Sequence, residues 1–537
     1  MAAREAPNTS SRAKRSDPIA SDQEIASATP CSPGSRQAFA PRPRNDSVQR
    51  LLRGGAWVGT AVIAASLVAP GAAAQQRRLH GLWIGGHLSP EGYVWVRMRV
   101  GLDSTANDRH ASIDVPFQFR NNQRSDIVLT GNRVTFQFGQ RAGRTTVDAV
   151  LRADTLDGVV KVGKDTRKLR LTLVQPVSRD TAARLAGLYE TEARQLISIG
   201  GPTEWGSISY LNFATGDNRH FFMTRKGLVA GPTLFVPHPP MMRLDVAPDS
   251  LGRRRIVVRD RKGTITARKL AFREEDVQFT SDVTISGTLI KPLAGRGPHR
   301  VVVFVHGSGP TSRDAFFSLP YYFAMHGVAS LVYDKRGVGR SGGTYTHDVD
   351  STRFELLAAD AIAGIKLLSK RSDIDTTRIG MWGISQAGWI IPIVAARAPE
   401  VDFVMIVSGP VTTLDQEGYF SLLTGDDGDG PRLPRAEIAR RMKAYSPKGF
   451  DPVPFLRAMR ISGLWIFGAK DESIPVDMSI EALEGLRKDG YPFEIVTFPA
   501  GQHVIWETVD GSRQQLPLVH RFVPGYFETL LRWMLSW

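Results

Sequence analysis

Cysteine is nearly absent from this chain. Its 537 residues include one, Cys31, which lies in a polar stretch near the N-terminus. A single thiol cannot close an intramolecular disulfide, and it cannot supply the cysteine cluster of a structural zinc site. We therefore expect neither disulfide nor thiolate-metal chemistry in the folded part of the protein.

Long basic blocks are also missing, although the chain is basic overall. Lysine and arginine total 68 against 53 acidic residues, which gives a formal net charge of +15. Proteins that bind nucleic acids or membrane surfaces usually gather such charge in a patch, whereas the arginines here are scattered along the whole sequence. No zinc-ligand spacing, phosphate loop or nucleic-acid motif is present. We expect a soluble basic surface, no bound metal and no nucleic-acid partner.

The N-terminal region lacks an apolar run as long as the roughly 20 residues of a comfortable membrane span. A shorter run from Ala56 to Ala69 follows Arg50 and Arg53 and precedes an alanine-rich exit that ends at Ala74. These are the parts of a secretory signal peptide. We predict a leader over residues 1–74 and an exported protein, periplasmic or secreted, with no stable membrane span after processing.

An uncleaved N-terminal membrane anchor is the alternative interpretation of this leader. Residues 1–47 are rich in Ser, Pro, Ala and Arg without apolar periodicity, which predicts disorder. Because this upstream part is long for a signal peptide, we expect the natural start to lie near Val48.

Two stretches after the leader have the pattern of β-strands. In residues 80–178, short runs such as 93–100 and 134–138 alternate apolar and polar side chains between Gly, Asn and Asp, which predicts antiparallel strands. Residues 179–272 form a second β-rich module. Its opening, Leu185–Tyr189, resembles Leu79–Trp83 in placing a glycine two residues before an aromatic side chain, which indicates a weak internal repeat.

The pattern changes at about residue 276, where apolar strands begin to alternate with amphipathic stretches. This alternation is typical of a parallel sheet with crossover helices. We predict strands at 301–305, 328–333, 379–384, 402–407, 461–467 and 493–498, and helices at 354–369 and 517–535. Residues 411–458, rich in Gly, Asp and Pro, are interpreted as an inserted lid. The expected fold class is α/β over residues 276–537, preceded by the β-rich region.

A serine stands where one predicted strand turns into a helix. Strand 379–384 leads into Gly383–Gly388, with Ser385 at the turn. Such a turn pushes the hydroxyl out of the sheet and places it at a helix N-terminus, where backbone N–H groups favour a developing oxyanion. Ala387 replaces the last glycine of the usual G-x-S-x-G pattern, and we expect Gly388 to keep the strand and helix close. A helix N-cap is the alternative role for Ser385.

A carboxylate and an imidazole follow at the ends of two later strands. Asp471 closes the run that starts at Leu464, and His503 follows the strand that ends at Phe498. A neutral imidazole that takes the serine proton, held by a carboxylate, would complete a catalytic triad. We therefore predict Ser385, Asp471 and His503 as the triad. The competing acid, Asp477, and the competing base, His520, each fall inside a predicted helix.

A glycine-rich loop, His306–Pro310, follows the first long strand. A loop of this kind can point backbone N–H groups at the nucleophile. We predict an oxyanion hole made by the N–H of Gln386 and by one from this loop, Ser308 in preference to Gly307. His306 itself is interpreted as a structural residue that holds the turn.

Residues 276–537 resemble the α/β-hydrolase superfamily, in the branch of serine aminopeptidase-like hydrolases and related esterases. The resemblance rests on five pieces in the same order, namely His306–Pro310, Tyr333–Ser341, Gly383–Gly388, Gly468–Asp471 with Pro475, and His503. It implies a triad in this chain order, an enzyme without a cofactor, and a structural loop after Tyr333. Within that loop the resemblance implies that Asp334 and Arg336 support the rim of the active site. His306 and Gly307 are likewise interpreted as structural support.

The predicted reaction is acyl transfer to Ser385 followed by attack of water, on a small-molecule ester or related acyl substrate. Amide or peptide cleavage is the alternative, because a triad alone does not separate esters from amides. No acidic pair that would bind a free peptide amine is obvious, although carboxylates in the predicted lid could serve, namely Asp426, Asp427 and Asp429. The sequence predicts no oligomeric state.

A hypothesis from another class is a non-catalytic protein built on a hydrolase scaffold. In it, the β-rich region would bind cell-wall or glycan material by stacking sugars on Trp83, Trp95 and Trp205.

Overall fold

The computed structural model describes residues 77–102, 110–139, 144–248, 254–316, 318–347, 349–426 and 430–537. The predicted leader, with Cys31 and the cleavage position at Ala74, lies outside these residues. Across the described ranges, no helix combines the length and apolar character that crossing a membrane requires.

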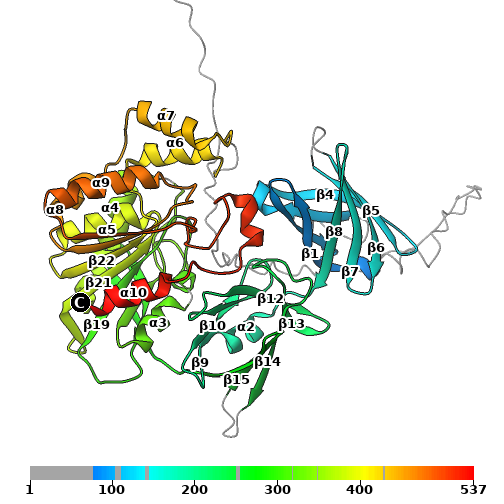
Figure 1. Cartoon of the computed structure of the whole chain (residues 1–537). Helices are drawn as coiled ribbons and strands as arrows, with labels where there is room; N and C mark the ends of the chain where they lie inside the picture. The colour runs from blue at the N-terminus through cyan, green and yellow to red at the C-terminus, as the bar shows by residue number, and fades with distance from the viewer. Residues whose placement is uncertain are drawn as a thin grey trace, which may run out of the picture.

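Residues 81–174 form a closed antiparallel barrel of eight strands, drawn in blue and cyan in Figure 1. Its core is apolar because alternate side chains of each strand point inward, as Val147, Ala149 and Leu151 do. The barrel begins after η1 (Arg77–Leu79) and contains η2 (Pro116–Gln118). Its strands are β1 (Gly81–Ser89), β2 (Gly92–Val100), β3 (His110–Val115), β4 (Arg120–Thr130), β5 (Arg133–Phe138), β6 (Thr145–Arg152), β7 (Thr155–Val162) and β8 (Asp165–Val174).

A second closed antiparallel barrel follows after helix α2 (Arg179–Leu185). It lies between the first barrel and the C-terminal domain in Figure 1. Its strands are β9 (Gly187–Thr191), β10 (Leu196–Pro202), β11 (Ile208–Asn212), β12 (Asn218–Thr224), β13 (Gly227–Ala230), β14 (Met242–Pro248), β15 (Arg254–Asp260) and β16 (Gly263–Lys269).

The first strands of the two barrels begin with the same local structure, which supports the weak internal repeat predicted from the sequence. Gly81 and Gly187 begin the first strand of each barrel with φ of 138° and 142°, a region that favours glycine. Trp83 Nε1 donates to the carbonyl four residues earlier at 2.8 Å, and the Tyr189 hydroxyl does the same at 2.7 Å. Both aromatic side chains are fully buried.

The C-terminal domain is built on one eight-stranded sheet, and the predicted α/β class is confirmed. The strand order is β17-β18-β20-β19-β21-β22-β23-β24, with parallel pairing from β20 through β19 to β24 and antiparallel pairing at the β17 edge. The strands are β17 (Arg273–Thr280), β18 (Thr284–Lys291), β19 (His299–Val305), β20 (Ala329–Tyr333), β21 (Ile374–Ile384), β22 (Val401–Val407), β23 (Ser462–Gly468) and β24 (Phe493–Phe498).

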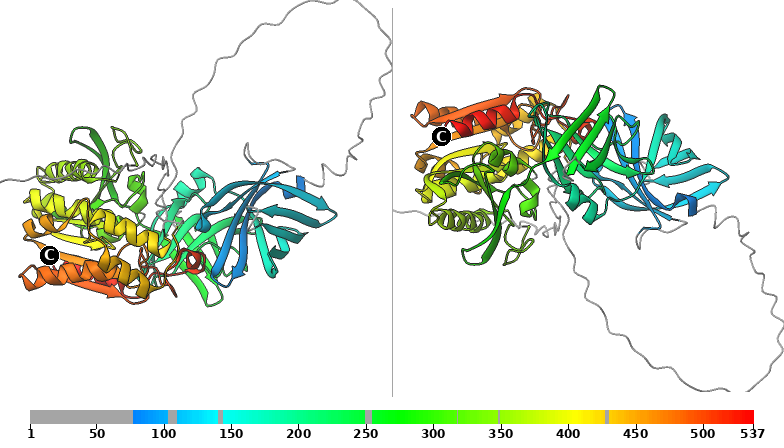
Figure 2. Two further views of the ribbon diagram at one scale, coloured as in Figure 1. Left: turned by 90° about the horizontal axis from the view of Figure 1, so that it is seen from above. Right: turned by 90° about the horizontal axis from the view of Figure 1, so that it is seen from below.

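Helices cover both faces of this sheet, as Figures 1 and 2 show. One face packs against α4 (Ser351–Leu368), α5 (Ala387–Arg397), α8 (Val453–Ala458) and α9 (Val476–Lys488). The other packs against η4 (Arg313–Phe316), α3 (Leu319–Met325) and α10 (Tyr526–Leu535). Two further helices, α6 (Leu414–Thr424) and α7 (Arg435–Ala444), belong to the 411–458 segment and lie beyond one end of the strands (Figure 1).

The predicted helix at 517–535 is wrong in its first half. Residues 513–518 form the short helix η5 (Arg513–Leu518), the chain is then extended, and α10 begins only at Tyr526. The extended part is held by the second barrel, where Asn218 N donates to His520 O at 2.8 Å and Leu234 N to Val519 O at 2.6 Å. Tertiary pairing has therefore replaced a helix that the apolar spacing suggested.

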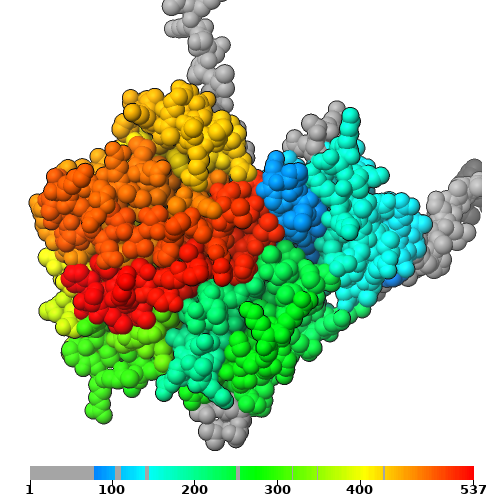
Figure 3. All heavy atoms as spheres, in the orientation of Figure 1, coloured from blue at the N-terminus to red at the C-terminus, as the bar shows by residue number. Residues whose placement is uncertain are grey.

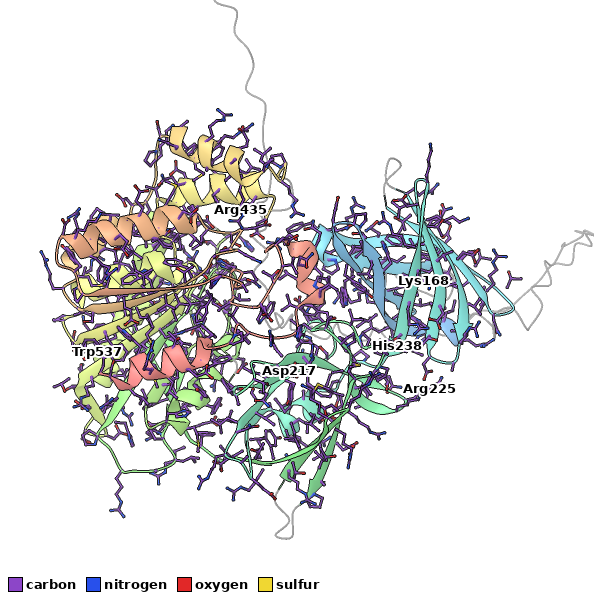
Figure 4. All side chains as sticks on the ribbon, viewed as in Figure 1. Lys168, Asp217, Arg225, His238, Arg435 and Trp537 are labelled. Carbon is purple, nitrogen blue, oxygen red and sulfur yellow. The ribbon has the colours of Figure 1, made fainter. Side chains whose placement is uncertain are left out.

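This 504–522 segment connects the C-terminal domain to both barrels. Three side chains of this segment, Trp506, Leu516 and Val519, belong to one apolar cluster. The same cluster contains Trp95 of the first barrel and Phe235 of the second. Figure 3 shows the orange-red part of the chain reaching from the C-terminal domain to the blue barrel, and Asp217, labelled in Figure 4, lies at this junction. The three folded parts therefore meet at the loop that follows His503.

Candidate active site

Ser385 sits on a strained turn between β21 and α5. Its φ is 57°, a left-handed value that costs a non-glycine residue of the order of 1–3 kcal/mol and that accumulates at functional sites. Two bonds hold the turn, from Ser385 N to Val407 O at 3.0 Å and from Gly388 N to Ser385 O at 2.8 Å. A strained serine at the carboxyl end of a strand and the start of a helix is the arrangement of a nucleophile elbow.

Small residues make this turn possible. A Cβ added at Gly383 would lie 2.5 Å from the Ala387 Cβ, and one added at Gly388 would lie 2.5 Å from the Gly409 Cα. Real Cβ atoms do not approach other atoms so closely, so both positions require glycine. Gly388 therefore provides the close packing beside the elbow, and Ala387 fits as a fully buried residue.

Asp471 and His503 form a hydrogen-bonded pair at the same edge of the sheet. Asp471 follows β23 and His503 follows β24, while Ser385 follows β21, two strands from β23. His503 Nδ1 lies 2.8 Å from Asp471 Oδ2. The other carboxylate oxygen, Oδ1, accepts the backbone N–H groups of Ser473 at 2.8 Å and Ile474 at 3.2 Å. These bonds fix the carboxylate, which in turn orients the imidazole.

The pKa of His503 is raised above its ordinary value. Burial alone would lower the pKa, but the charge and hydrogen bond of Asp471 act in the opposite direction, and the nearby carboxyl groups of Asp426 and Glu417 add to them. An imidazole with a raised pKa is a stronger base toward the serine proton, and it gains more from its carboxylate once it is protonated.

The predicted oxyanion loop lies beside the elbow. Gly307 is buried, and a Cβ added to it would meet Ile384 O at 3.2 Å and the Ser385 Cβ at 3.5 Å. The backbone at Gly307 therefore approaches the end of β21 and the Ser385 side chain closely, and Ser308 is the next residue of this loop. Gln386, whose N–H is the other predicted donor, is buried at the start of α5.

The remaining predicted support residues fall into two ion-pair networks beside this loop. Asp334 accepts the side chain of Arg313, including Nη2 at 3.0 Å, and the backbone N–H of Arg340 at 2.8 Å. Arg336 donates to Asp360 of α4 through Nε at 2.8 Å and Nη2 at 2.7 Å. Both networks connect the 334–341 loop to the body of the domain.

His306 is buried at the end of β19, with 3% of it exposed. Its ring lies 4.7 Å from that of Phe316 and 5.0 Å from that of Tyr333, measured between centroids. Burial lowers the pKa of His306 to about 3, so this imidazole is neutral and packs as an aromatic residue.

The competing acid and base lie elsewhere. Asp477 is exposed in the first turn of α9, as predicted. His520 is not on the last helix, contrary to the sequence prediction, but in the extended stretch whose backbone pairs with Asn218. His503 bonded to Asp471 is thus the acid–base pair at the strand ends.

Sequence reasoning missed two side chains that reach the site region from other parts of the chain. Glu417 of α6 interacts electrostatically with His503, and burial raises the pKa of Glu417 to about 8. Arg513 of η5 donates from Nε to Asp426 Oδ1 at 3.0 Å, and its guanidinium lies 4.6 Å from the ring centre of Phe119 in the first barrel. Neither position carries a local motif, so no sequence signal could have identified it.

The other carboxylates suggested in the lid, Asp427 and Asp429, lie outside the described residues. Among the residues that are described, no group of three or more His, Cys, Asp or Glu side chains is placed to hold a metal ion.

The tryptophans considered for glycan stacking are buried. Trp83 and Trp95 have no exposed surface, and 9% of Trp205 is exposed. Trp95 Nε1 donates to Phe235 O at 2.9 Å, and its ring lies 5.1 Å from that of Trp205. Trp95 and Trp205 pack in the apolar cluster between the barrels, whereas Trp83 lies in the core of the first barrel, so none of the three presents a face to a sugar.

Known proteins similar to this chain include both esterases and peptidases. Residues 314–529 match the prolyl oligopeptidase family. Esterase EstD of Thermotoga maritima is 26% identical over 233 residues, which cover 38% of this chain and 53% of EstD. A probable dipeptidyl-aminopeptidase B of Aspergillus oryzae is 25% identical over 248 residues, which cover 43% of this chain and 26% of that protein.

The chain thus spans about half of EstD and about a quarter of the aminopeptidase. Among solved structures, an esterase from Pyrococcus furiosus aligns with 50% of this chain and 93% of its own, with 22% identity and a TM-score of 0.36.

Proposed function

We propose that this chain, whose C-terminal domain belongs to the α/β-hydrolase superfamily, hydrolyses carboxylic esters with Ser385 as the nucleophile. His503 takes the serine proton and then returns it to the leaving alcohol, and Asp471 holds the imidazole in the required orientation. The observation that carries the proposal is the Asp471–His503 bond, fixed by two backbone N–H groups, at the sheet edge where Ser385 occupies a strained elbow.

In the proposed reaction, Ser385 Oγ attacks the carbonyl carbon and the alkoxide oxygen moves into the oxyanion hole. The N–H groups of Gln386 and Ser308 stabilise the charge that develops there. Collapse of the intermediate expels the alcohol and leaves an acyl-serine. Water, deprotonated by His503, then releases the carboxylic acid and restores the enzyme.

Amide cleavage is the second candidate, because residues 314–529 match the prolyl oligopeptidase family, but the carboxyl groups near His503 weigh against it. A peptide amine is cationic and needs an anionic partner. Asp426 already accepts bonds from Arg513 and Ser473, and the pKa of Glu417 is raised to about 8 by burial. At neutral pH a carboxyl with this pKa is mostly protonated and uncharged, and this favours a neutral ester over a cationic peptide.

A substrate panel on the purified full chain separates the two candidates. We expect hydrolysis of p-nitrophenyl acetate, butyrate or octanoate to exceed that of aminoacyl p-nitroanilides in kcat/KM. Ser385→Ala should lower kcat by roughly 10⁴–10⁶ with the fold intact, whereas Ser536→Ala, at the exposed end of α10, should change nothing. Undiminished ester hydrolysis in the Ser385→Ala protein would refute the assignment, and a preference for anilides would select the second candidate.

We also propose that the enzyme is exported, on the support of the signal-peptide pattern alone. N-terminal sequencing of the protein from its natural source should show a chain that begins at Gln75. A mature protein that begins at Ala2 would contradict export through this signal.

A further inference from the structure

Lys335 is a buried lysine without an acidic partner. It lies directly after β20, and 2% of it is exposed. Its Nζ makes no ion pair with any carboxylate of the described residues. Burying an ammonium without a counter-ion is costly, and burial lowers the pKa of Lys335 to about 7. The contacts that the side chain does make must therefore account for its place in the fold.

Three oxygen atoms accept hydrogen bonds from this ammonium. They are Gly307 O at 2.7 Å, Gly309 O at 3.0 Å and Gln386 Oε1 at 3.3 Å. The three donors of a lysine side chain match three acceptors. With every N–H of the ammonium directed at an oxygen, the side chain ties these three acceptors together.

The three acceptors belong to the two segments assigned to the oxyanion hole. The carbonyl of Gly307 and the N–H of Ser308 form one peptide group, which is planar and trans, so its N–H points opposite to its C=O. A bond from Lys335 to Gly307 O therefore sets the direction of the Ser308 N–H. It also polarises that peptide and makes the N–H a stronger donor.

The second segment is held through the side chain of Gln386. Its Oε1 is tied to the same ammonium as the two loop carbonyls, while its backbone N–H is the other predicted oxyanion donor. One cation thus fixes the distance between the glycine loop after β19 and the first residues of α5.

We propose that Lys335 is a positioning residue of the oxyanion hole, which keeps the loop donor and the Gln386 donor aimed at one point. This inference rests on the proposed function, because it presumes that Ser385 is the nucleophile. The role is selective for the transition state. The carbonyl oxygen of a bound ester carries little charge, whereas the tetrahedral oxyanion needs both donors at short range.

The test replaces Lys335 by Met, which keeps the length of the side chain and removes its donors. We expect kcat for the best p-nitrophenyl ester to fall by roughly 10–100-fold, less than the roughly 10²–10³-fold cost of removing an oxyanion-hole donor outright, because the donors are misaligned and not removed. KM should be nearly unchanged. The affinity for a trifluoromethyl ketone of the same acyl chain, which forms an oxyanion on the serine, should fall by the same factor.

Two further variants make the result decisive. Lys366→Met, on the exposed face of α4, controls for loss of a lysine and should leave both quantities unchanged. Lys335→Arg retains donors for the carbonyls. Its kcat and its affinity for the ketone should therefore fall less than those of Lys335→Met, and both should fall by the same factor. Each protein is assayed at a temperature where circular dichroism shows it folded.

The proposal is overturned if folded Lys335→Met keeps its kcat. It is also overturned if kcat falls while the affinity for the ketone does not, because a merely structural lysine would give that pattern. Failure of the proposed function is recognised separately, since the wild-type protein would then lack esterase activity or Ser385→Ala would retain it.

Discussion

Replacing Asp471 by Asn tests how the structure sets the state of His503. Asp471 Oδ1 accepts two backbone N–H groups, from Ser473 and Ile474, and Oδ2 faces His503 Nδ1. In an asparagine the amide oxygen will take the position bonded by the two N–H groups, because an NH₂ there would face two donors. The NH₂ group must then point at His503.

An NH₂ group facing Nδ1 requires that nitrogen to accept, so the proton moves to Nε2, the nitrogen that should accept the serine proton. The geometry is kept and the tautomer is wrong, a change that lowers kcat by about 10⁴ in serine proteases, equivalent to roughly 5 kcal/mol of activation free energy.

The assay is steady-state hydrolysis of a p-nitrophenyl ester, with thermal unfolding followed by circular dichroism. Asp477→Asn makes the same chemical change at an exposed position of α9 and should behave as wild type. An Asp471→Asn enzyme whose kcat stays within tenfold of wild type would show that this carboxylate does not control the base.

Further substitutions test the pKa of His503, the packing of the elbow and the Tyr189 hydrogen bond. Because Asp471 raises the pKa of His503 against the effect of burial, and Asp426 adds to it, the acid limb of kcat/KM should lie above the ordinary imidazole value of about 6.5. Asp426→Asn should move that limb to lower pH, and an unmoved limb would remove Asp426 from the site. Gly388→Ala should destabilise the protein by about 1–3 kcal/mol through overpacking, whereas Gly485→Ala, with nothing within 4 Å, should stabilise it by up to about 1 kcal/mol; urea unfolding distinguishes these signs. Tyr189→Phe leaves a buried carbonyl unpaired and should cost about 1–3 kcal/mol in the same measurement; no loss would show that water replaces the hydroxyl.

Much of the C-terminal domain could be predicted because each strand carries its own signal. The apolar runs at 301–305 and 461–467 coincide with β19 and β23 to within two residues, since a strand buried on both faces is largely apolar. The segment at 517–525 could not be predicted, because its apolar residues bind the barrels and only tertiary contacts decide its conformation.

Alternation predicted the N-terminal strands but not their closure. A strand with one buried face has the same alternation of apolar and polar residues in an open sheet and in a barrel. What closes each barrel is the pairing of its first and last strands, β1 with β8 and β9 with β16. The two strands of each pair are far apart in sequence, and no residue pattern predicts that they pair.

The candidate site divides in the same way. Ser385 and Asp471 stand at turns that short motifs define, whereas Glu417 reaches His503 only through the placement of α6. Lys335 belongs to a recognisable loop, but nothing in the sequence tells which carbonyls its side chain meets.

The most direct test of the central claim is covalent labelling by a fluorophosphonate, with the modified residue located by mass spectrometry. We expect one adduct, on the Oγ of Ser385, which forms rapidly in the wild-type protein and very slowly after His503→Ala. Labelling of a different residue, or labelling of Ser385 at an unchanged rate without the imidazole, would contradict it.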